Sequence, residues 1–216
     1  MFTYNTTKPW MLYVKAFFLV LYCSIAKSQN STEQIISSES IKDVVIDGNQ
    51  IFKIDIITHD LPEIRLQSQI DGEYLEFFQI TKTIKNGAIN IQLEENPVIS
   101  IPDDKRNAHK VVAAKLLLTI PNGLNLNIVS DIGSVSLTGR FDVLSIQLLE
   151  GFCEIEGTAL KSTINTIEGN ISIKTSKGKV IAETRYGKLA LASFNNKDEV
   201  WRLKSINGDI TVTKKN

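Results

Sequence analysis

The sequence predicts an all-β protein in which an antiparallel N-terminal part leads into a right-handed parallel β-solenoid. The first observation behind this prediction is a set of glycines spaced by 18, 18, 18 and 21 residues: Gly133, Gly151, Gly169, Gly187 and Gly208. The second is an alternation of apolar residues on both sides of each glycine, which is the period of a strand. The third is that no amphipathic helix can be recognised after residue 28. Self-similarity at a fixed period is typical of a solenoid, and parallel connections of this kind are right-handed.

Each glycine unit reads as strand, glycine turn, strand. The residue two positions after the glycine is always apolar: Val135, Cys153, Ile171, Leu189 and Ile210. The residue four positions after it is apolar as well: Leu137, Ile155, Ile173, Leu191 and Val212. Such a unit buries its apolar face only by stacking on its neighbours, with strands about 4.8 Å apart. Stacking in chain order would place Ile171 between Cys153 and Leu189.

The glycines are interpreted as corner formers, because a corner often needs positive φ or a close approach of two chain segments. The last spacing is three residues longer than the others. We expect these residues to form a bulged loop within Phe194–Glu199, which is a tolerated surface insertion.

The first 28 residues are interpreted as a signal peptide. They contain three lysines, no acidic residue and the apolar run AFFLVLYCSI. Ala26 and Ser28 are small residues at the −3 and −1 positions of a cleavage site, so Gln29 would begin the mature chain. An uncleaved membrane anchor is the alternative, although the apolar core is short for a span. Cys23 raises the question of lipidation, which the bulky Tyr22 before it disfavours.

Removal of that segment changes the charge and the cysteine content. The full chain has 24 basic and 24 acidic residues, and the mature chain would carry a net charge of about −3. This argues against nucleic acid as a partner, and also against electrostatic binding to a membrane. Only Cys153 remains of the two cysteines, so no internal disulfide is available and the domain depends on core burial.

The N-terminal part is expected to contain a flexible polar leader at residues 29–40 and antiparallel strands at 41–120. Dipeptides typical of hairpin turns separate the strands: Asp47-Gly48, Asp71-Gly72 and Asn86-Gly87. The expected strands are Lys42–Asp47, Gln50–His59, Ile64–Ile70, Tyr74–Ile84, Ala88–Glu94 and Lys110–Ile120. Pro102–His109 is expected to form a mobile loop. The five-coil solenoid then occupies residues 121–216, in one continuous domain with 41–120.

The alternating N-terminal strands, the phrase KLLLTIPNGLNLNI and the units IEGNISI and INGDITV resemble the bacterial putative-adhesin domain family. The resemblance covers about Val44 to Thr213. Gly208-Asp209 matches the Gly-Asp often found in that family, and Gly169-Asn170 is a variant of it. The resemblance implies a right-handed β-helix-like fold and a location in the cell envelope. It implies no catalytic residue.

Few residues in the sequence are candidates for chemistry. His59 and His109 are 50 residues apart and in no metal-ligand spacing, so both are interpreted as surface histidines. The sequence contains no G-x-S-x-G elbow and no phosphate-binding glycine loop. Cys153 occupies an inward column and is interpreted as a buried structural thiol. No cofactor and no metal site is expected.

Glu154 and Glu156 are the only carboxylate pair on the outward columns, about 7 Å apart on one strand. Lys174 would lie beside Glu156 on the next unit, so a surface ion pair is the simpler interpretation. We therefore expect a non-catalytic, exported envelope protein that serves as an adhesin, a scaffold or a binding module. Its partner would be a carbohydrate or a protein of the periplasm, surface or medium. The alternatives are a polysaccharide lyase or hydrolase and a periplasmic signalling accessory domain.

Overall fold

The computed structural model describes residues 31–71, 75–98, 113–196 and 198–215. The signal peptide and the Pro102–His109 loop expected from the sequence lie outside these residues. The described part is all-β, apart from one 3-10 turn, η1 (Leu75–Phe77). Its strands are β1 (Ser31–Ser37), β2 (Asp43–Asp47), β3 (Ile51–His59), β4 (Glu63–Asp71), β5 (Phe78–Lys85), β6 (Ala88–Glu95), β7 (Ala113–Pro121), β8 (Asn125–Ile132), β9 (Ser134–Glu150), β10 (Cys153–Glu168), β11 (Ile171–Thr175), β12 (Lys179–Thr184), β13 (Leu189–Leu191), β14 (Val200–Ser205) and β15 (Ile210–Lys214).

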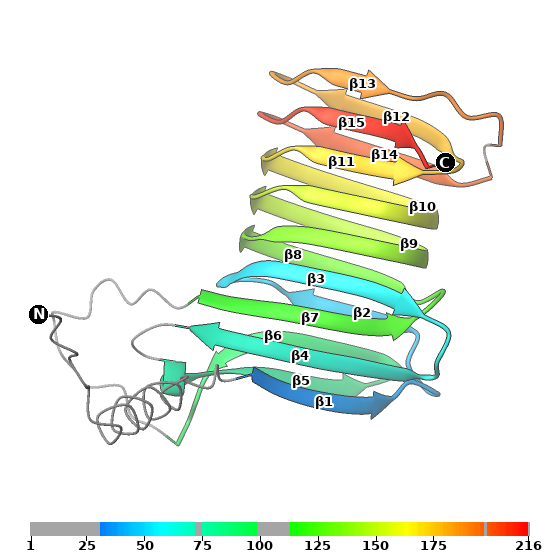
Figure 1. Ribbon diagram of the computed structural model, residues 1–216. Coiled ribbons are helices and arrows are strands. Elements are labelled where there is room, and N and C mark those ends of the chain that lie inside the picture. The colour runs from blue at the N-terminus through cyan, green and yellow to red at the C-terminus, as the bar shows by residue number, and fades with distance from the viewer. Residues whose placement is uncertain (1–30, 72–74, 99–112, 197, 216) are drawn as a thin grey trace, which may run out of the picture.

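These strands form one mixed, mostly parallel sheet that folds into two facing layers without closing on itself (Figure 1). The front layer runs β1-β4-β7-β3-β9-β10-β11-β15-β13. The back layer runs β5-β6-β2-β8-β9-β10-β14-β12. β9 and β10 belong to both layers, because their first residues pair in front and their last residues pair behind. Apolar side chains from both layers meet between them and form a single core.

A pair of glycines allows β9 and β10 to pass from one layer to the other. Gly139 and Gly157 are opposite each other in the parallel register, at the bend of each strand. A Cβ on Gly157 would overlap the carbonyl oxygen of Gly139, and one on Gly139 would overlap the Thr58 hydroxyl. Close approach of neighbouring strands therefore requires glycine here. This second glycine ladder was not predicted from the sequence.

The five recurrent glycines lie at the opposite corner of the strand stack, where each closely approaches the backbone of the neighbouring level of the stack. A Cβ on Gly151, Gly169 or Gly208 would overlap the carbonyl oxygen of Gly133, Gly151 or Gly169, respectively. Of these five glycines, only Gly151 has a positive φ, at 113°. The expectation that they form corners is confirmed. The dominant reason for glycine at these corners is close packing between successive levels of the stack rather than a left-handed backbone.

The expected stacking order is wrong for the last two units. β15 pairs with β11 on one side and β13 on the other, and β14 lies in the same way between β10 and β12. The last unit of the chain is thus inserted beneath the unit that precedes it. Ile171 lies between Cys153 and Ile210, not beside Leu189. Periodicity identified the inward column but could not reveal the spatial order of its members.

The residues that lengthen the last spacing make this exchange of order possible. The chain leaves β13, which is the last strand of the front layer. It must then step back to begin β14, which lies one strand further in than β12 in the back layer. Phe194 is buried at one end of this connection and Glu199 at the other, so its ends are not a surface bulge as expected. The backbone N–H of Gly178 donates to Asn196, which fastens the connection to the turn before β12.

The N-terminal part is mixed rather than antiparallel. The pairs β1–β4, β4–β7 and β5–β6 are antiparallel, whereas β2–β6 and β3–β7 are parallel. Asn86-Gly87 forms the expected hairpin between β5 and β6, with positive φ at both residues. Asp47-Gly48 does not form one, because β2 and β3 lie in opposite layers. A turn dipeptide in the sequence cannot distinguish a hairpin from a change of layer.

Part of the expected flexible leader is ordered. Ser31–Ser37 forms β1, which pairs with β4 along its whole length. Ile36 packs against the core, while Ile35 points to solvent and is 62% exposed. The many polar residues of this segment suit an edge strand, although they led to the expectation of a flexible leader. Within the described residues, no helix has the length and apolar character needed for a membrane span.

Candidate functional site

Apolar side chains gather on the outer face of the back layer. Val129 lies on β8, Leu149 on β9 and Ile167 on β10, and they are 42%, 43% and 41% exposed. The residues that precede or follow them, Ser130, Leu148 and Thr166, are buried. Since side chains alternate along a strand, the exposed set faces away from the core. We call this surface the outer groove.

The outer groove is hollowed, with a volume of about 430 Å³. Gln147 and Asn165 contribute amide groups to it, and Asp131 and Lys204 contribute opposite charges. A second hollow, of about 350 Å³, shares Asn165 and Lys204 with the first and extends across β14 to β12. The two hollows adjoin at Asn165 and Lys204, and both are lined by a mixture of aliphatic and polar side chains.

This distribution is unusual for the type of sheet. Parallel strands are normally covered on both faces, and their exposed apolar side chains tend to mark contact surfaces. Here β8, β9, β10 and β14 are parallel neighbours. The core covers their inner face, but nothing in the described part of the chain covers the hollows of the outer face. Among the described residues, the hollows on the outer face of the back layer are therefore open to solvent.

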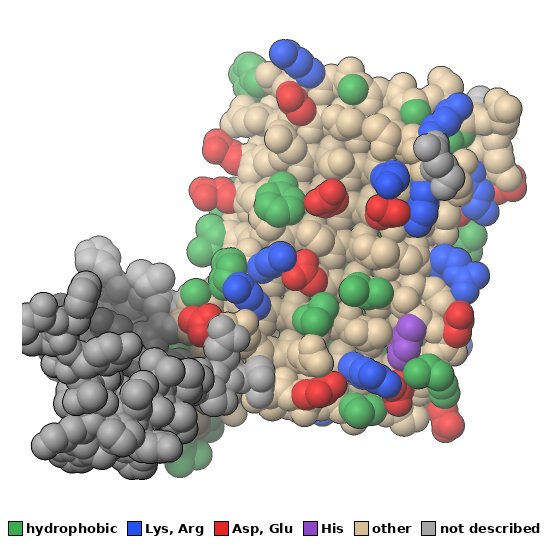
Figure 2. Space-filling view, in the orientation of Figure 1, with side chains coloured by type: hydrophobic (Ala, Val, Ile, Leu, Met, Phe, Trp, Pro, Cys, Tyr) green, Lys and Arg blue, Asp and Glu red, His purple; other side chains and the backbone are tan. Residues whose placement is uncertain are grey.

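The outer face of the front layer has a different composition. The outward side chains of the glycine units are mainly small, polar or charged, as in Ser136, Ser172, Thr211 and Thr213. Figure 2 looks at this face and shows acidic and basic side chains interspersed, with green apolar side chains mostly isolated. It resembles an ordinary solvated surface.

The structure places Glu154 and Glu156 on this front face, as expected. Glu156 forms ion pairs with Lys174 at 3.4 Å and with Lys215 at 3.1 Å. Hydrogen bonds from Lys215 and Lys174 lower the pKa of its carboxyl group. Glu154 is exposed, and its strand neighbour across the register is Ser172. A glycosidase-type pair needs one carboxyl group with a raised pKa to act as the acid, and the ion pairs favour the opposite at Glu156.

The other residues singled out by the sequence also have structural environments. The Cys153 thiol is fully buried, and burial raises its pKa to about 12, which disfavours the reactive thiolate. His59 Nε2 lies 2.8 Å from the carbonyl oxygen of Glu63 across the turn that joins β3 to β4. His109 lies outside the described residues. Within them, no group of three or more His, Cys, Asp and Glu side chains could hold a metal ion.

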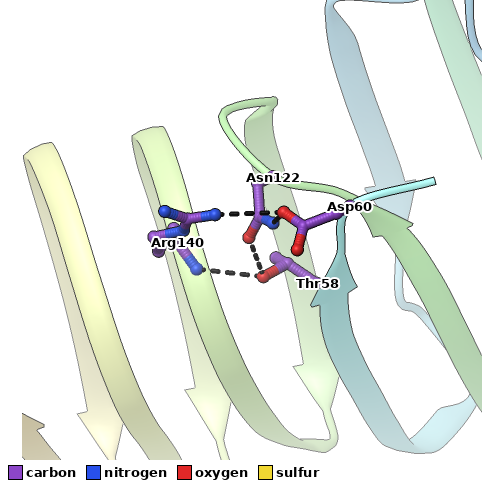
Figure 3. Close-up of polar contacts among 4 residues, drawn as sticks. All are labelled: Thr58, Asp60, Asn122 and Arg140. Atoms are coloured by element: carbon purple, nitrogen blue, oxygen red, sulfur yellow. Dashed lines mark hydrogen bonds and ion pairs between the residues drawn. The ribbon is translucent and has the colours of Figure 1, made fainter. Parts of the chain in front are cut away.

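A polar cluster missed by the sequence analysis joins the N-terminal strands to the first bend (Figure 3). Asn122 donates to Asp60 at 2.7 Å and accepts from the Thr58 hydroxyl at 2.6 Å. Arg140 forms an ion pair with Asp60 at 3.1 Å, and its backbone N–H donates to Thr58 at 3.0 Å. These contacts satisfy one another across three chain segments, so the cluster is a structural corner. The Pro121-Asn122-Gly123 turn was visible in the sequence, but its partners were not.

A buried carboxylate was missed as well. Glu199 is 2% exposed, and its Oε1 lies 3.3 Å from Lys177 Nζ. Burial raises its pKa, although hydrogen bonds from Lys177 and the Ala159 backbone oppose the shift. Its Oε2 and Trp201 Nε1 are buried without a hydrogen-bond partner in the described part of the chain. The only signal in the sequence was the irregular spacing of the last unit.

The sequence matches no protein-family model and no curated protein. Solved structures do match it. A putative cell adhesion protein from Clostridium sporogenes ATCC 15579 aligns with 87% of this chain and 100% of its own, at 11% identity and a TM-score of 0.60. A putative adhesin from Bacteroides fragilis NCTC 9343 aligns with 87% of this chain and 98% of its own, at 12% identity and a TM-score of 0.38. The resemblance to the putative-adhesin domain family is thereby confirmed at the level of the fold, which this chain shares with the Clostridium protein.

Proposed function

We propose that this chain is an exported, non-catalytic binding module of the cell envelope, of the adhesin type, and that it binds its partner in the outer groove. The observation that carries the proposal is the exposed aliphatic surface formed by Val129, Leu149 and Ile167 across three parallel strands. Contiguous exposed apolar side chains on the outer face of a layer tend to mark a contact surface. The exposed aliphatic surface is explained if another molecule covers it.

The chemistry of the outer groove favours a protein as the partner. The apolar side chains of its lining are all aliphatic. The described lining has no aromatic ring, whereas aromatic side chains are the usual contact for the apolar face of a sugar ring. Gln147 and Asn165 each supply an amide donor and acceptor, which suits polypeptide groups beside aliphatic side chains. A partner that presents Leu, Ile or Val beside backbone amides would match both features.

Other features support export and the absence of catalysis. The lysine-bearing, apolar N-terminal segment fits a signal peptide, which would place the protein in the periplasm, on the surface or in the medium. The ion-paired Glu156 and the buried Cys153 are unsuited to acid catalysis and nucleophilic attack. The shared fold with a putative cell adhesion protein supports the same function by analogy.

We also infer that the glycine units form an irregular β-solenoid in which the last two units, β12 with β13 and β14 with β15, have exchanged places. The support is the parallel register that carries equivalent columns from β9 to β10, β11, β15 and β13. The back layer has the same parallel arrangement, from β8 to β9, β10, β14 and β12, and this arrangement gives the outer groove its length. A binding surface of several parallel strands suits a partner that lies across them.

Two matched substitutions test the site of binding. Ile167→Asp places a charge in the outer groove, whereas Ser172→Asp places the same charge on the front face. Fluorescently labelled protein would be incubated with the envelope fraction of the source bacterium, and the bound fraction measured against concentration. We expect Ile167→Asp to weaken association by about tenfold or more and Ser172→Asp to leave it unchanged. Equal binding by the two variants would remove the outer groove as the binding surface.

A separate assay tests the absence of catalysis. Purified protein would be incubated with acidic and neutral polysaccharides, with and without Ca²⁺, and reducing ends and unsaturated sugars would be measured. We expect no turnover, and we expect Glu154→Gln combined with Glu156→Gln to leave envelope association unchanged. Sugar products that disappear in this double variant would instead establish a carbohydrate-active enzyme.

A further inference from the structure

β12 and β13 form one end of the stack and are edge strands. Among the described strands, β12 pairs only with β14 and β13 only with β15 (Figure 1, top). Apolar side chains remain exposed at this end: Ile181 is 46%, Leu189 48% and Leu191 42% exposed. An edge with unpaired backbone groups and exposed apolar side chains can accept a further strand.

The sequence of β12 is complementary to itself when two copies run antiparallel. Its first five residues are Lys179, Val180, Ile181, Ala182 and Glu183. Lys179, Ile181 and Glu183 are exposed and share the outer face, while Val180 and Ala182 are half-buried. With a two-fold axis through Ile181, each Lys179 faces the Glu183 of the second copy and the two Ile181 side chains face each other. Opposite charges and apolar pairs stabilise antiparallel partners in these positions.

We propose that a second copy of this chain docks edge to edge on β12 and β13 through this two-fold axis. The pairing extends the front and back layers into the second copy, and the interface is isologous. On β13, the sequence Leu189, Ala190, Leu191 is also symmetric, so an antiparallel pair brings Leu189 opposite Leu191 of the second copy. The hollow of about 380 Å³ at this end, lined in part by Val180, Leu191 and Phe194, is covered by the same contact.

A contact within the chain positions the charged residue of the proposed interface. Glu183 lies on β12, and Lys204 lies opposite it on the neighbouring strand β14. Lys204 Nζ is 2.6 Å from Glu183 Oε1. In the dimer, Glu183 is placed between Lys204 and the Lys179 of the second copy, so charges alternate across the junction. The opposite edge of the back layer lacks this pattern. Its strand, β5, has the sequence FQITKTIK, in which both charged residues are lysines.

Charge exchange provides a direct test. Lys179→Glu places two glutamates opposite each other in a homodimer, and Glu183→Lys places two lysines opposite each other. Each variant alone is expected to dimerise at least about tenfold more weakly than the unaltered protein. An equimolar mixture is expected to recover dimers, because the introduced glutamate of one variant faces the introduced lysine of the other. Sedimentation of purified protein over a concentration series measures all three cases, and circular dichroism verifies folding.

A third variant and a control complete the test. Ile181→Lys brings two like charges together on the axis and is expected to give monomers, whereas Ser172→Lys on the front layer leaves the dimer intact. The proposal is overturned if the unaltered protein sediments as a monomer throughout the series. It is equally overturned if dimers persist unchanged in Ile181→Lys, or if the mixture of charge variants remains monomeric.

Discussion

Ile171 and Leu189 occupy the same position of two consecutive glycine units, yet their environments differ. Each is the second residue after its glycine and the first residue of a front-layer strand. Ile171 is completely buried, with Cys153 on one side and Ile210 on the other. Leu189 has Ile210 on one side and no strand on the other within the described residues, and it is 48% exposed.

This difference shows that two properties of a repeat position are independent: the direction of its side chain and the extent of its burial. The pattern specifies which side chains point inward, because their direction follows from alternation along the strand. The amount of buried surface depends on how many layers cover the position, and that number depends on spatial order. The free-energy cost of placing a charge at these equivalent positions should therefore be large at Cys153, Ile171 and Ile210, which have strands on both sides, and small at Leu189, which has a strand on one side.

The largest expected effect comes from placing a charge at the two positions. Ile171→Lys buries an unpaired amine and should lower the free energy of unfolding by about 4 kcal/mol. Leu189→Lys should cost less than about 1 kcal/mol, because the lysine amine can extend into water. Chemical denaturation at low protein concentration would measure both. Ser172→Lys, which points outward beside Ile171, is the control and should cost less than about 0.5 kcal/mol. Equal losses for Ile171→Lys and Leu189→Lys would contradict the exchanged order.

A smaller effect is expected from adding a methyl group at the glycine corner. In Gly169→Ala the new Cβ overlaps the carbonyl oxygen of Gly151, and layers on both sides oppose a shift. We expect a loss of about 3 kcal/mol. In Gly187→Ala the Cβ overlaps the Gly208 carbonyl oxygen, but the outermost layer can move away from its neighbour. A loss of about 1 kcal/mol is expected there, again from chemical denaturation. An equal or larger loss at Gly187 would show that the outermost unit of the stack is at least as constrained as the inner ones.

The smallest effect concerns the buried carboxylate at the step between the two exchanged layers. Burial raises the pKa of Glu199, so the folded protein retains a proton that the unfolded chain releases. Stability should therefore fall as pH rises from about 4.5 through the raised pKa of the folded state. Glutamine at position 199 cannot ionise, so the melting temperature of Glu199→Gln relative to that of the unaltered protein should increase as pH rises above about 4.5. A difference in melting temperature that stays constant as pH rises above about 4.5 would show that the pKa of Glu199 is not raised in the folded protein.

Much of the fold could be predicted from local patterns, as particular strands show. Ile51–His59 and Ala88–Glu95 differ by one residue or less at each end from their expected ranges, because alternation and turn dipeptides are local signals. β1 was missed because edge strands are polar and short of local signal. The parallel pairing of β3 with β7 joins segments about 60 residues apart, and no local pattern encodes such a partner.

The site was less predictable than the fold. Burial of Cys153 and the ion pair between Lys174 and Glu156 followed from the columns of the repeat and are confirmed. The outer groove was not anticipated, although Leu149 and Ile167 were visible at equivalent positions, two residues before their glycines. Apolar residues outside the inward columns were the available signal. They form one surface only because β8, β9, β10 and β14 are neighbours in the sheet. β14 is next to β10 although three strands separate them in the chain.

The insertion of β14 and β15 beneath β12 and β13 has a consequence for biosynthesis. A chain that emerges N-terminus first presents β12 and β13 before the layer that supports them exists. Their apolar columns match those of β10 and β11, so early docking there would occupy the place that β14 and β15 need. Such a premature arrangement must dissolve before folding finishes, which is a kinetic trap of the kind that stacked proteins encounter. We therefore expect refolding to have a slow step that is absent from a chain shortened after β11.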